Sequence, residues 1–167
     1  MGISESLIPE LEMEAAVTRR LIERVPEDKL DWRPHEKSMP LGRLATHLAE
    51  LPGWGKITIA QDVLDIGEGF TPTILRSVPE ILDLFDKNVA EFKELLANTP
   101  DEEFMKTWTM KHKGQTVFSS PKIGVVRGTV MNHMVHHRGQ LTVYLRLNEV
   151  QLPMTYGPSA DETGGFE

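Results

Sequence analysis

Apolar residues recur at steps of three and four along four stretches of the chain, a spacing that predicts four amphipathic helices. We expect these helices at about residues 5–25, 38–64, 77–98 and 123–148. The third stretch has the cleanest pattern. Ser77 at its start is the expected N-cap, because a serine side chain can accept a backbone N–H of the first turn.

Proline and glycine residues affect where the second predicted helix begins and whether it is continuous. Ser38 is its expected N-cap, with Pro40 in the first turn, where a missing N–H costs nothing. Pro52 and Gly53 are expected to kink or interrupt the helix. The helical pattern can then resume from residue 57 to residue 64.

The spacing changes between the third and fourth helices. Residues 104–120 do not recur at helical steps, and the run His112-Lys113-Gly114-Gln115 separates two β-prone segments, so we expect a short β-hairpin. Residues 65–77 form a connection that contains Gly and Pro, and residues 149–167 form an irregular tail that is expected to lie on the surface. The predicted fold class is all-α, with a small β-hairpin before the last helix.

Length and charge restrict the domain organisation and the classes of partner that the protein can have. A chain of 167 residues has the size of one domain, and we expect residues 1–167 to form a single one. With 18 Lys and Arg against 25 Asp and Glu, the formal net charge is −7. An acidic chain without a basic block is a poor candidate for nucleic-acid binding, and anionic membrane surfaces are disfavoured for the same reason. No stretch approaches the roughly 18 apolar residues that cross a bilayer.

The chain has no cysteine. This excludes disulfides, thiolate metal ligands, iron–sulfur clusters and a cysteine nucleophile, so thiol chemistry would need a thiol that arrives on a ligand. A chain without cysteine is compatible with a reducing cytosol, and the first residues show no signal-peptide pattern. We therefore expect a cytoplasmic protein.

Three of the six histidines interrupt apolar helical stripes. His133 and His137 are four residues apart, which places both rings on one helix face, able to point at a common ion. His47 interrupts the stripe of the second helix in the same way. A buried polar group without a partner costs about 1–3 kcal/mol. These imidazoles therefore need either ordinary hydrogen bonds in the core or a metal ion shared between two facing helices.

The other histidines and two aromatic residues have alternative uses. His136 could chelate in place of a neighbour, but it lies beside the stripe, so a surface role or a role in supporting a ligand is favoured. His35 and His112 fall in a loop and a turn and are expected to be solvated. Trp54 fits either the core or, with Tyr144 and the hairpin, the wall of a pocket.

Three segments resemble the DinB/YfiT-like family of metalloenzymes. Residues 33–54, RPHEKSMPLGRLATHLAELPGW, are similar to its second helix, and residues 132–146, NHMVHHRGQLTVYLR, to its last helix. Residues 152–162, LPMTYGPSADE, resemble its carboxyl-terminal ending. A His-x-x-x-His pair alone is a weak signal, but it becomes specific together with the upstream helix histidine and the continuation Arg138-Gly139-Gln140-Leu141.

The resemblance implies a four-helix bundle with up-down-down-up order, often dimeric, that holds one divalent ion on three histidines. Matched residue by residue, the ligands would be His47, His133 and His137. Family members include transferases and isomerases that use low-molecular-weight bacterial thiols, so a small-molecule substrate and such a thiol as co-substrate are expected. Nitrogen ligands suit zinc, nickel, copper and iron, and zinc or nickel is favoured here.

Three functions are compatible with these residues. A site with three protein ligands leaves a coordination position for water or substrate, which favours a catalytic metal site. Together with this, the resemblance implies a metal-dependent enzyme of the thiol-dependent S-transferase type. A metal-dependent hydrolase would need a general base, for which Glu50 is the nearest acid on its helix, although a solvated glutamate is the simpler interpretation. A non-catalytic, metal-binding stress-response protein is the third, and a structural metal would make folding depend on the ion.

Overall fold

Within the part of the chain that the computed structural model describes, residues 2–67 and 72–165, the protein is mostly helical with a small sheet. The long helices are α1 (Ile3–Ile22), α2 (Leu41–Ala60), α3 (Val78–Ala97) and α6 (His133–Leu147). The shorter elements are η1 (Glu27–Lys29), α4 (Asp101–Phe104), α5 (Lys122–Val125) and the π-helical η2 (Val126–Asn132). α5, η2 and α6 follow one another directly, so residues 122–147 form one helical run.

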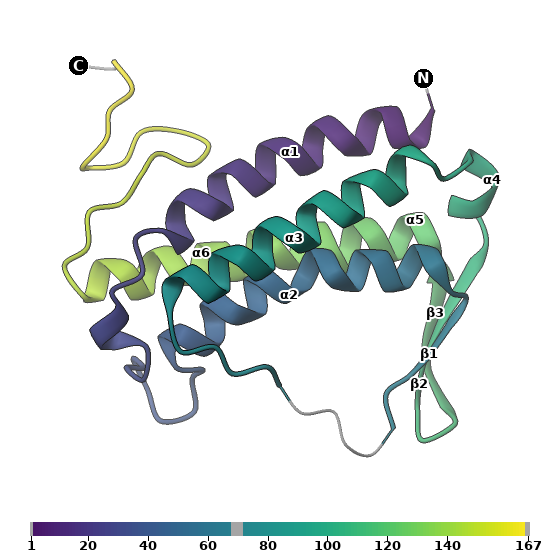
Figure 1. The fold of residues 1–167 in the computed structure, drawn as a ribbon, viewed down its shortest axis with the longest axis horizontal. Coiled ribbons are helices and arrows are strands. Elements are labelled where there is room, and N and C mark those ends of the chain that lie inside the picture. Colours follow the sequence, from purple (N-terminus) through teal and green to yellow (C-terminus); the bar gives the residue numbers. More distant parts are fainter. Residues whose placement is uncertain (1, 68–71, 166–167) are drawn as a thin grey trace.

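The long helices lie side by side and share one hydrophobic core (Figure 1). Both α1 and α2 contact α3 and α6, so each apolar stripe faces two neighbours. Fully buried side chains come from each partner, among them Leu11 of α1, Leu44 of α2, Phe85 of α3 and Leu141 of α6. Burial of each such side chain contributes about 1.5–3 kcal/mol, which explains why the stripes pack against one another. The helical stripes expected from the sequence are confirmed.

The start of α3 follows its prediction, but the start of α2 does not. Ser77 is the N-cap of α3, and its side chain accepts the backbone N–H of Glu80 at 3.3 Å. Helix α2, by contrast, begins at Leu41 with Pro40 in the N-cap position, and Ser38 is not its cap. The N–H of Ser38 donates to the carbonyl of His35, so the chain is still in a turn there.

Helix α2 is continuous through Pro52 and Gly53 and ends at Ala60. Small residues are needed in its second half because α3 lies close to it. A Cβ built on Gly55 would lie 2.5 Å from the ring of Phe92, and one built on Gly53 would lie 3.2 Å from the amide of Asn88. Gly53, which was expected to interrupt the helix with Pro52, and Gly55 therefore allow two helices to approach each other.

We expect Gly55→Ala to lower the free energy of unfolding by about 1–3 kcal/mol, because the methyl group would overpack against the ring of Phe92. Gly139→Ala is the matched control, since a Cβ on that helical glycine would meet nothing within 4 Å. It should stabilise the protein by about 0.5–1 kcal/mol through helix propensity alone. Urea unfolding of both variants measures the difference, and changes of the same sign would contradict this account of the contact.

A hairpin precedes the last helical run, as predicted. Strands β2 (Thr107–His112) and β3 (Gln115–Pro121) pair antiparallel. Lys113 and Gly114 form the turn between them with φ angles of 50° and 77°. Two successive positive φ angles give a turn whose twist matches that of the strands.

The sheet also contains a third strand that periodicity did not predict. β1 (Val63–Asp65) pairs with β2 in parallel, which gives the order β1-β2-β3. A helix was expected to resume over residues 57–64, but the helix ends at Ala60 and the chain then becomes extended. Three residues are too few to show a strand alternation, and the partner strand lies far along the chain. Of the connection expected at residues 65–77, residues 68–71 lie outside the described part.

The tail is irregular, as predicted, over the described residues 149–165, and it lies beside α1 and α6 (Figure 1). Arg20 of α1 pairs with Glu162, and Arg146 of α6 pairs with Asp161. The hydroxyl of Tyr156 donates to the carboxylate of Glu14 on α1 at 2.9 Å. The tail is therefore held to two of the long helices by polar contacts.

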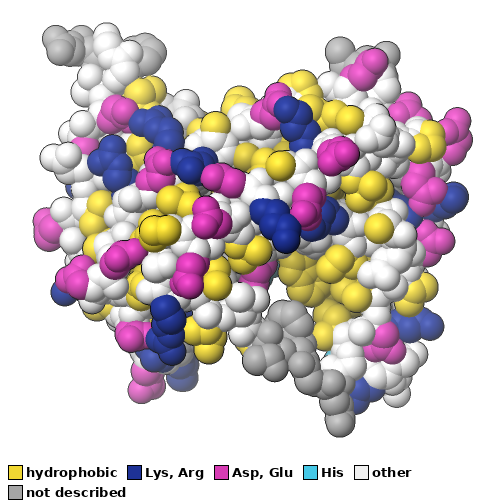
Figure 2. All heavy atoms as spheres, in the orientation of Figure 1, with side chains coloured by type: hydrophobic (Ala, Val, Ile, Leu, Met, Phe, Trp, Pro, Cys, Tyr) yellow, Lys and Arg dark blue, Asp and Glu magenta, His cyan; other side chains and the backbone are white. Residues whose placement is uncertain are grey.

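No helix in the described residues is apolar over a length sufficient to cross a bilayer. On the face drawn in Figure 2, Lys and Arg side chains are interspersed with Asp and Glu rather than gathered in a basic patch.

Candidate metal centre

Two facing helical segments bring three histidines together. His47 lies in the middle of α2, His133 begins α6, and His137 follows one turn later. The Nε2 atom of His133 lies 2.8 Å from Nε2 of His137 and 3.5 Å from Nε2 of His47. One ring nitrogen of each residue lies within 4.8 Å of those of the other two. The structure thus brings together the three residues that the helical stripes singled out.

The other nitrogen of each imidazole faces a separate acceptor. His47 Nδ1 lies 3.4 Å from a carboxylate oxygen of Glu50, and His137 Nδ1 lies 2.7 Å from the amide oxygen of Gln140. His133 Nδ1 lies 3.1 Å from the backbone carbonyl of Thr129. Because a carboxylate and a carbonyl only accept, these contacts favour the tautomer with the ring proton on Nδ1 and the lone pair on Nε2.

The converging Nε2 lone pairs fit a metal ion. Three acceptors that face one another without a shared proton repel, and a cation between them relieves this repulsion. Two nitrogen donors at the usual Zn–N distance of about 2.0–2.1 Å in tetrahedral geometry would lie about 3.3 Å apart, close to the separations found here. Side chains that hold the second nitrogen of a ligating histidine are typical of metal sites.

Burial keeps two of these histidines in the form that can ligate. The pKa of His137 is lowered to about 4, mainly by burial. The neighbouring histidines also lower it, whereas the hydrogen bond to Gln140 acts in the opposite direction. Burial and the proximity of His47 also lower the pKa of His133 below its usual value. Both rings are therefore neutral at neutral pH, as a metal ligand must be.

Glu50 is a partly buried, fixed carboxylate rather than a solvated one. Only 13% of its side chain is exposed, and it accepts a hydrogen bond from Arg43 at 2.9 Å and one from the backbone N–H of Thr73 at 3.3 Å. Burial opposes its ionisation, but hydrogen bonds from His47 and Thr73 and the charge of Arg43 outweigh that effect and lower its pKa to about 2. A carboxylate this acidic is a poor proton acceptor at neutral pH.

His136 lies on the surface and contacts the residue that orients a neighbour. Its Nε2 atom lies 3.2 Å from the amide nitrogen of Gln140, whose amide oxygen faces His137. This contact fixes which way the amide of Gln140 points. The structure therefore places His136 in the supporting position favoured by the sequence. His35 and His112 are exposed, as expected.

The helix changes its winding directly before the first histidine of the pair. The π-helical segment η2 ends at Asn132, and the backbone N–H of His133 donates to the carbonyl of Val130. The carbonyl of Thr129, one residue earlier, faces the ring of His133 instead. Such π-helical turns are rare and occur frequently at functional sites.

Arg138 holds this part of α6 against α1. Its guanidinium lies 2.6 Å from the carboxylate of Glu14, and both side chains are more than nine-tenths buried. It also donates to the carbonyl of Glu14 and contacts the hydroxyl of Thr18. The continuation Arg138-Gly139-Gln140-Leu141 thus contains an ion pair with α1, an orienting amide and a core side chain, which explains why it accompanies the histidines.

The supporting residues were missed or underestimated at the sequence level. Glu50 and Gln140 each lie three residues after a histidine, so the repeated spacing His-x-x-Glu and His-x-x-Gln is the signal that could have identified both. Thr129 acts through its backbone carbonyl, for which the sequence carries no signal. Tyr144, expected in a pocket wall, instead packs edge-on against Trp32 at 5.7 Å between ring centroids.

Comparisons with known proteins agree with this architecture. The sequence profile of the DinB family matches residues 4–164. The uncharacterized protein YrdA of Bacillus subtilis strain 168 is 24% identical over 155 residues, which cover 93% of this chain and 89% of that protein.

Two solved structures share the fold. One is a DinB-like protein from Bacillus cereus ATCC 10987, with a TM-score of 0.72, 22% identity and coverage of 91% of this chain and 97% of the other. The second is the DinB-like protein YjoA from Bacillus subtilis, with a TM-score of 0.69, 18% identity and coverage of 90% and 96%. At these identities the structural likeness concerns the fold.

Proposed function

The chain belongs to the DinB family, and on that premise we propose that it binds one divalent metal ion through His47, His133 and His137. The observation that carries this proposal is the convergence of the three Nε2 atoms, each held by a separate partner of Nδ1. Zinc or nickel is the proposed ion, because both accept three neutral imidazoles and leave positions open.

We further propose that the protein is an S-transferase that uses a low-molecular-weight thiol. A divalent ion on three neutral imidazoles would supply the positive charge that favours the ionised form of a nearby thiol or water. The thiol must come from a co-substrate, since the chain has no cysteine. In the reaction the thiol loses its proton to solvent and its sulfur bonds to carbon, while the leaving group departs with the electron pair of the broken bond.

The experiment that tests this proposal measures conjugation of a thiol to a model electrophile. Protein loaded with zinc or nickel is incubated with monochlorobimane and, in turn, cysteine, glutathione and a cysteinyl amino sugar. We expect at least one thiol to react faster than without protein, and His137→Ala to abolish the acceleration. Equal rates with the variant and the parent would overturn the transferase proposal while leaving metal binding intact.

A hydrolase is the second candidate for the same site. It would use Glu50 as general base, but this carboxylate has a pKa of about 2 and contacts Arg43, His47 and Thr73. These contacts suit a residue that orients His47, so the transferase is favoured over the hydrolase.

A non-catalytic metal-binding protein is the third candidate, and thermal unfolding distinguishes it. If the ion is structural, removing it with a chelator should lower the melting temperature sharply, because the binding energy is then folding energy. Here apolar side chains of the four long helices form a shared core. We therefore expect the protein to stay folded without the ion, and the melting temperature to fall only by the amount that loss of ligand binding causes.

We also propose the finer architecture that the family implies. The long helices would form a four-helix bundle in up-down-down-up order, and the protein would act as a cytoplasmic homodimer on a small-molecule substrate. Light scattering coupled to size exclusion tests the dimer directly, and a monomeric mass at micromolar concentration would contradict it.

The orienting side chains give a graded prediction for metal affinity. Gln140→Ala removes the acceptor of His137 Nδ1 without removing a ligand, so we expect zinc affinity to fall about 10–100-fold. Glu50→Ala should act in the same range through His47. Glu91→Ala is the control, since Glu91 pairs with Lys56 on the surface and touches no histidine in the described structure. Competition with a chromophoric chelator measures all three, and unchanged affinity in both test variants would contradict the assigned roles.

A further inference from the structure

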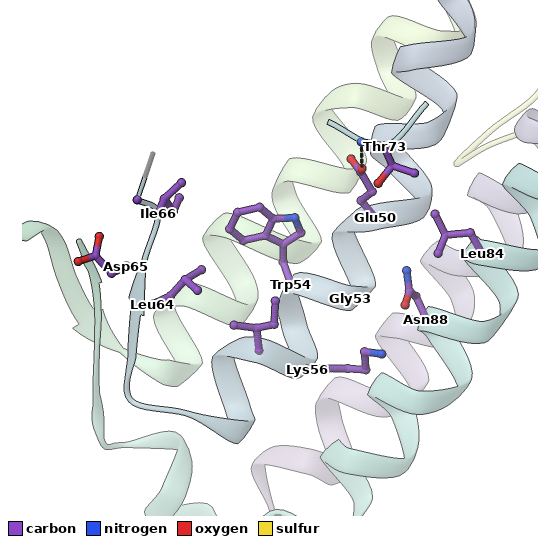
Figure 3. Close-up of a pocket in the computed structure, with 12 residues that line it drawn as sticks. Glu50, Gly53, Trp54, Lys56, Leu64, Asp65, Ile66, Thr73, Leu84 and Asn88 are labelled. Carbon is purple, nitrogen blue, oxygen red and sulfur yellow. Dashed lines mark hydrogen bonds between the residues drawn. The ribbon is translucent and has the colours of Figure 1, made fainter. Parts of the chain in front are cut away.

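A cavity of about 580 Å³ lies between α2, β1 and α3 (Figure 3). Figure 2 shows hydrophobic side chains gathered in a hollow of this face, between the helices and the sheet. This volume is in the range of pockets that hold small organic ligands.

The walls of the cavity are mainly apolar. The indole of Trp54 lies at the centre of one wall, with Leu64 and Ile66 facing it from the extended chain (Figure 3). Leu84 of α3 contributes to the other side. A large aromatic face between aliphatic side chains is the type of surface that binds flat or bulky apolar groups.

Among the described residues that line the cavity, Glu50 and Lys56 already have charged partners. Glu50 contacts Arg43 and the N–H of Thr73, and Lys56 pairs with Glu91. Asp65 is exposed to water and accepts the N–H of Gly114. An anionic ligand entering this space would lose hydration without gaining an unpaired cation among the described lining residues, which is costly. The cavity therefore favours a neutral ligand over an anionic one.

The cavity and the metal centre share one wall residue. Glu50 lines the cavity with one side of its carboxylate near Thr73 (Figure 3). The same carboxylate contacts Nδ1 of His47. The cavity therefore borders the residue that contacts His47.

We propose that this cavity binds a neutral, mainly apolar organic molecule against Trp54. Resting on the proposed function, we assign this molecule as the electrophile that receives the thiol. The size, the apolar walls, the pairing of Lys56 with Glu91 and the shared residue Glu50 support this assignment. Specificity then comes from the cavity, while the histidines serve any substrate whose reactive carbon reaches them.

A matched pair of fluorescent probes tests the binding. N-phenylnaphthylamine is neutral, whereas anilinonaphthalene sulfonate has the same rings and one negative charge. We expect the neutral probe to bind the purified protein with one site per chain, and the sulfonate to bind at least about tenfold more weakly because its charge finds no partner. Equal affinity for the two probes would overturn the proposal.

Filling the cavity provides the second part of the test. Leu84→Trp and, independently, Ile66→Trp should each weaken binding of the neutral probe about tenfold or more, because the added ring occupies the ligand's space. Leu82→Trp is the matched control, since Leu82 lies on the same helix and does not line the cavity. Circular dichroism identifies variants that fold. Unchanged binding in a folded cavity variant, or equal loss in the control, would contradict the assignment.

The outcomes separate this inference from the proposed function. Probe binding is measured on metal-free protein, so it does not depend on the histidines. If the parent binds the probe while His137→Ala retains full thiol conjugation, the metal-dependent reaction fails and the cavity remains a binding site. If zinc binds normally but no cavity variant affects the probe or the range of electrophiles accepted, the cavity assignment fails alone.

Discussion

His137→Ala is expected to lower the affinity of the protein for zinc by more than about 100-fold. The substitution removes one of three nitrogen donors that lie within 4.8 Å of one another. Loss of a side chain that merely orients a ligand typically costs 10–100-fold, so loss of the ligand itself should exceed this range. Competition with a chromophoric chelator at neutral pH provides the affinity.

The matched control removes a histidine that lies away from the centre. His112 is exposed at the end of β2, so His112→Ala should retain the zinc affinity of the parent protein. His47→Ala and His133→Ala should match His137→Ala, although they come from different helical segments. Similar affinities for the His137 and His112 variants would show that zinc binds elsewhere.

The second large effect concerns stability, at the ion pair between α1 and α6. Glu14→Gln should lower the free energy of unfolding by about 3–5 kcal/mol, because it leaves the guanidinium of Arg138 charged, buried and without its counter-ion. Both partners are more than nine-tenths buried, and Tyr156 of the tail also donates to the same carboxylate. Urea unfolding of the parent and the variant measures this difference.

The same helix offers a matched surface pair. Glu10 of α1 pairs with Arg127 at 2.9 Å, but both side chains are substantially exposed. Glu10→Gln should therefore cost no more than about 1 kcal/mol. Replacing Glu14 and Arg138 together, by Leu and Met, should recover much of the loss, because no unpaired charge is then left in the core. Equal costs for the buried and the surface pair would contradict this interpretation.

The helices and the histidine trio were predictable because both follow from local spacing. A side chain's place on a helix face depends only on its residue number, so Leu44, His47 and Leu141 could be assigned to buried stripes from the sequence. Two polar rings one turn apart in such a stripe, facing a third on another helix, indicate a shared partner. The structure brings these three rings together.

Features that depend on contacts between distant segments were not predictable. The strand Val63–Asp65 forms because β2 lies beside it, and its own three residues contain no alternation. Gly53 of α2 suggested an interruption, whereas it allows the close approach of Asn88, as Gly55 allows that of Phe92. In both cases the decisive neighbour is far away in the sequence.

The supporting shell of the site falls between these extremes. Glu50 and Gln140 share a spacing of three residues from a histidine, which a helix brings onto neighbouring positions, so they could have been recognised. The carbonyl of Thr129 faces His133 beside the π-helical segment η2, and a change in winding has no reliable sequence pattern. The positions of the three ligands therefore follow from local spacing in the sequence. The orientation of His133 depends in addition on the backbone geometry of η2.

Nitrogen-15 NMR of the histidine rings tests the central claim most directly. In metal-free protein at neutral pH, we predict that His47, His133 and His137 all carry their proton on Nδ1, with unprotonated Nε2 atoms. One equivalent of zinc should then shift the Nε2 resonances of these three residues together and leave those of His35 and His112 unchanged. Protonation on Nε2 in the metal-free protein, or zinc shifts confined to the exposed histidines, would contradict the account.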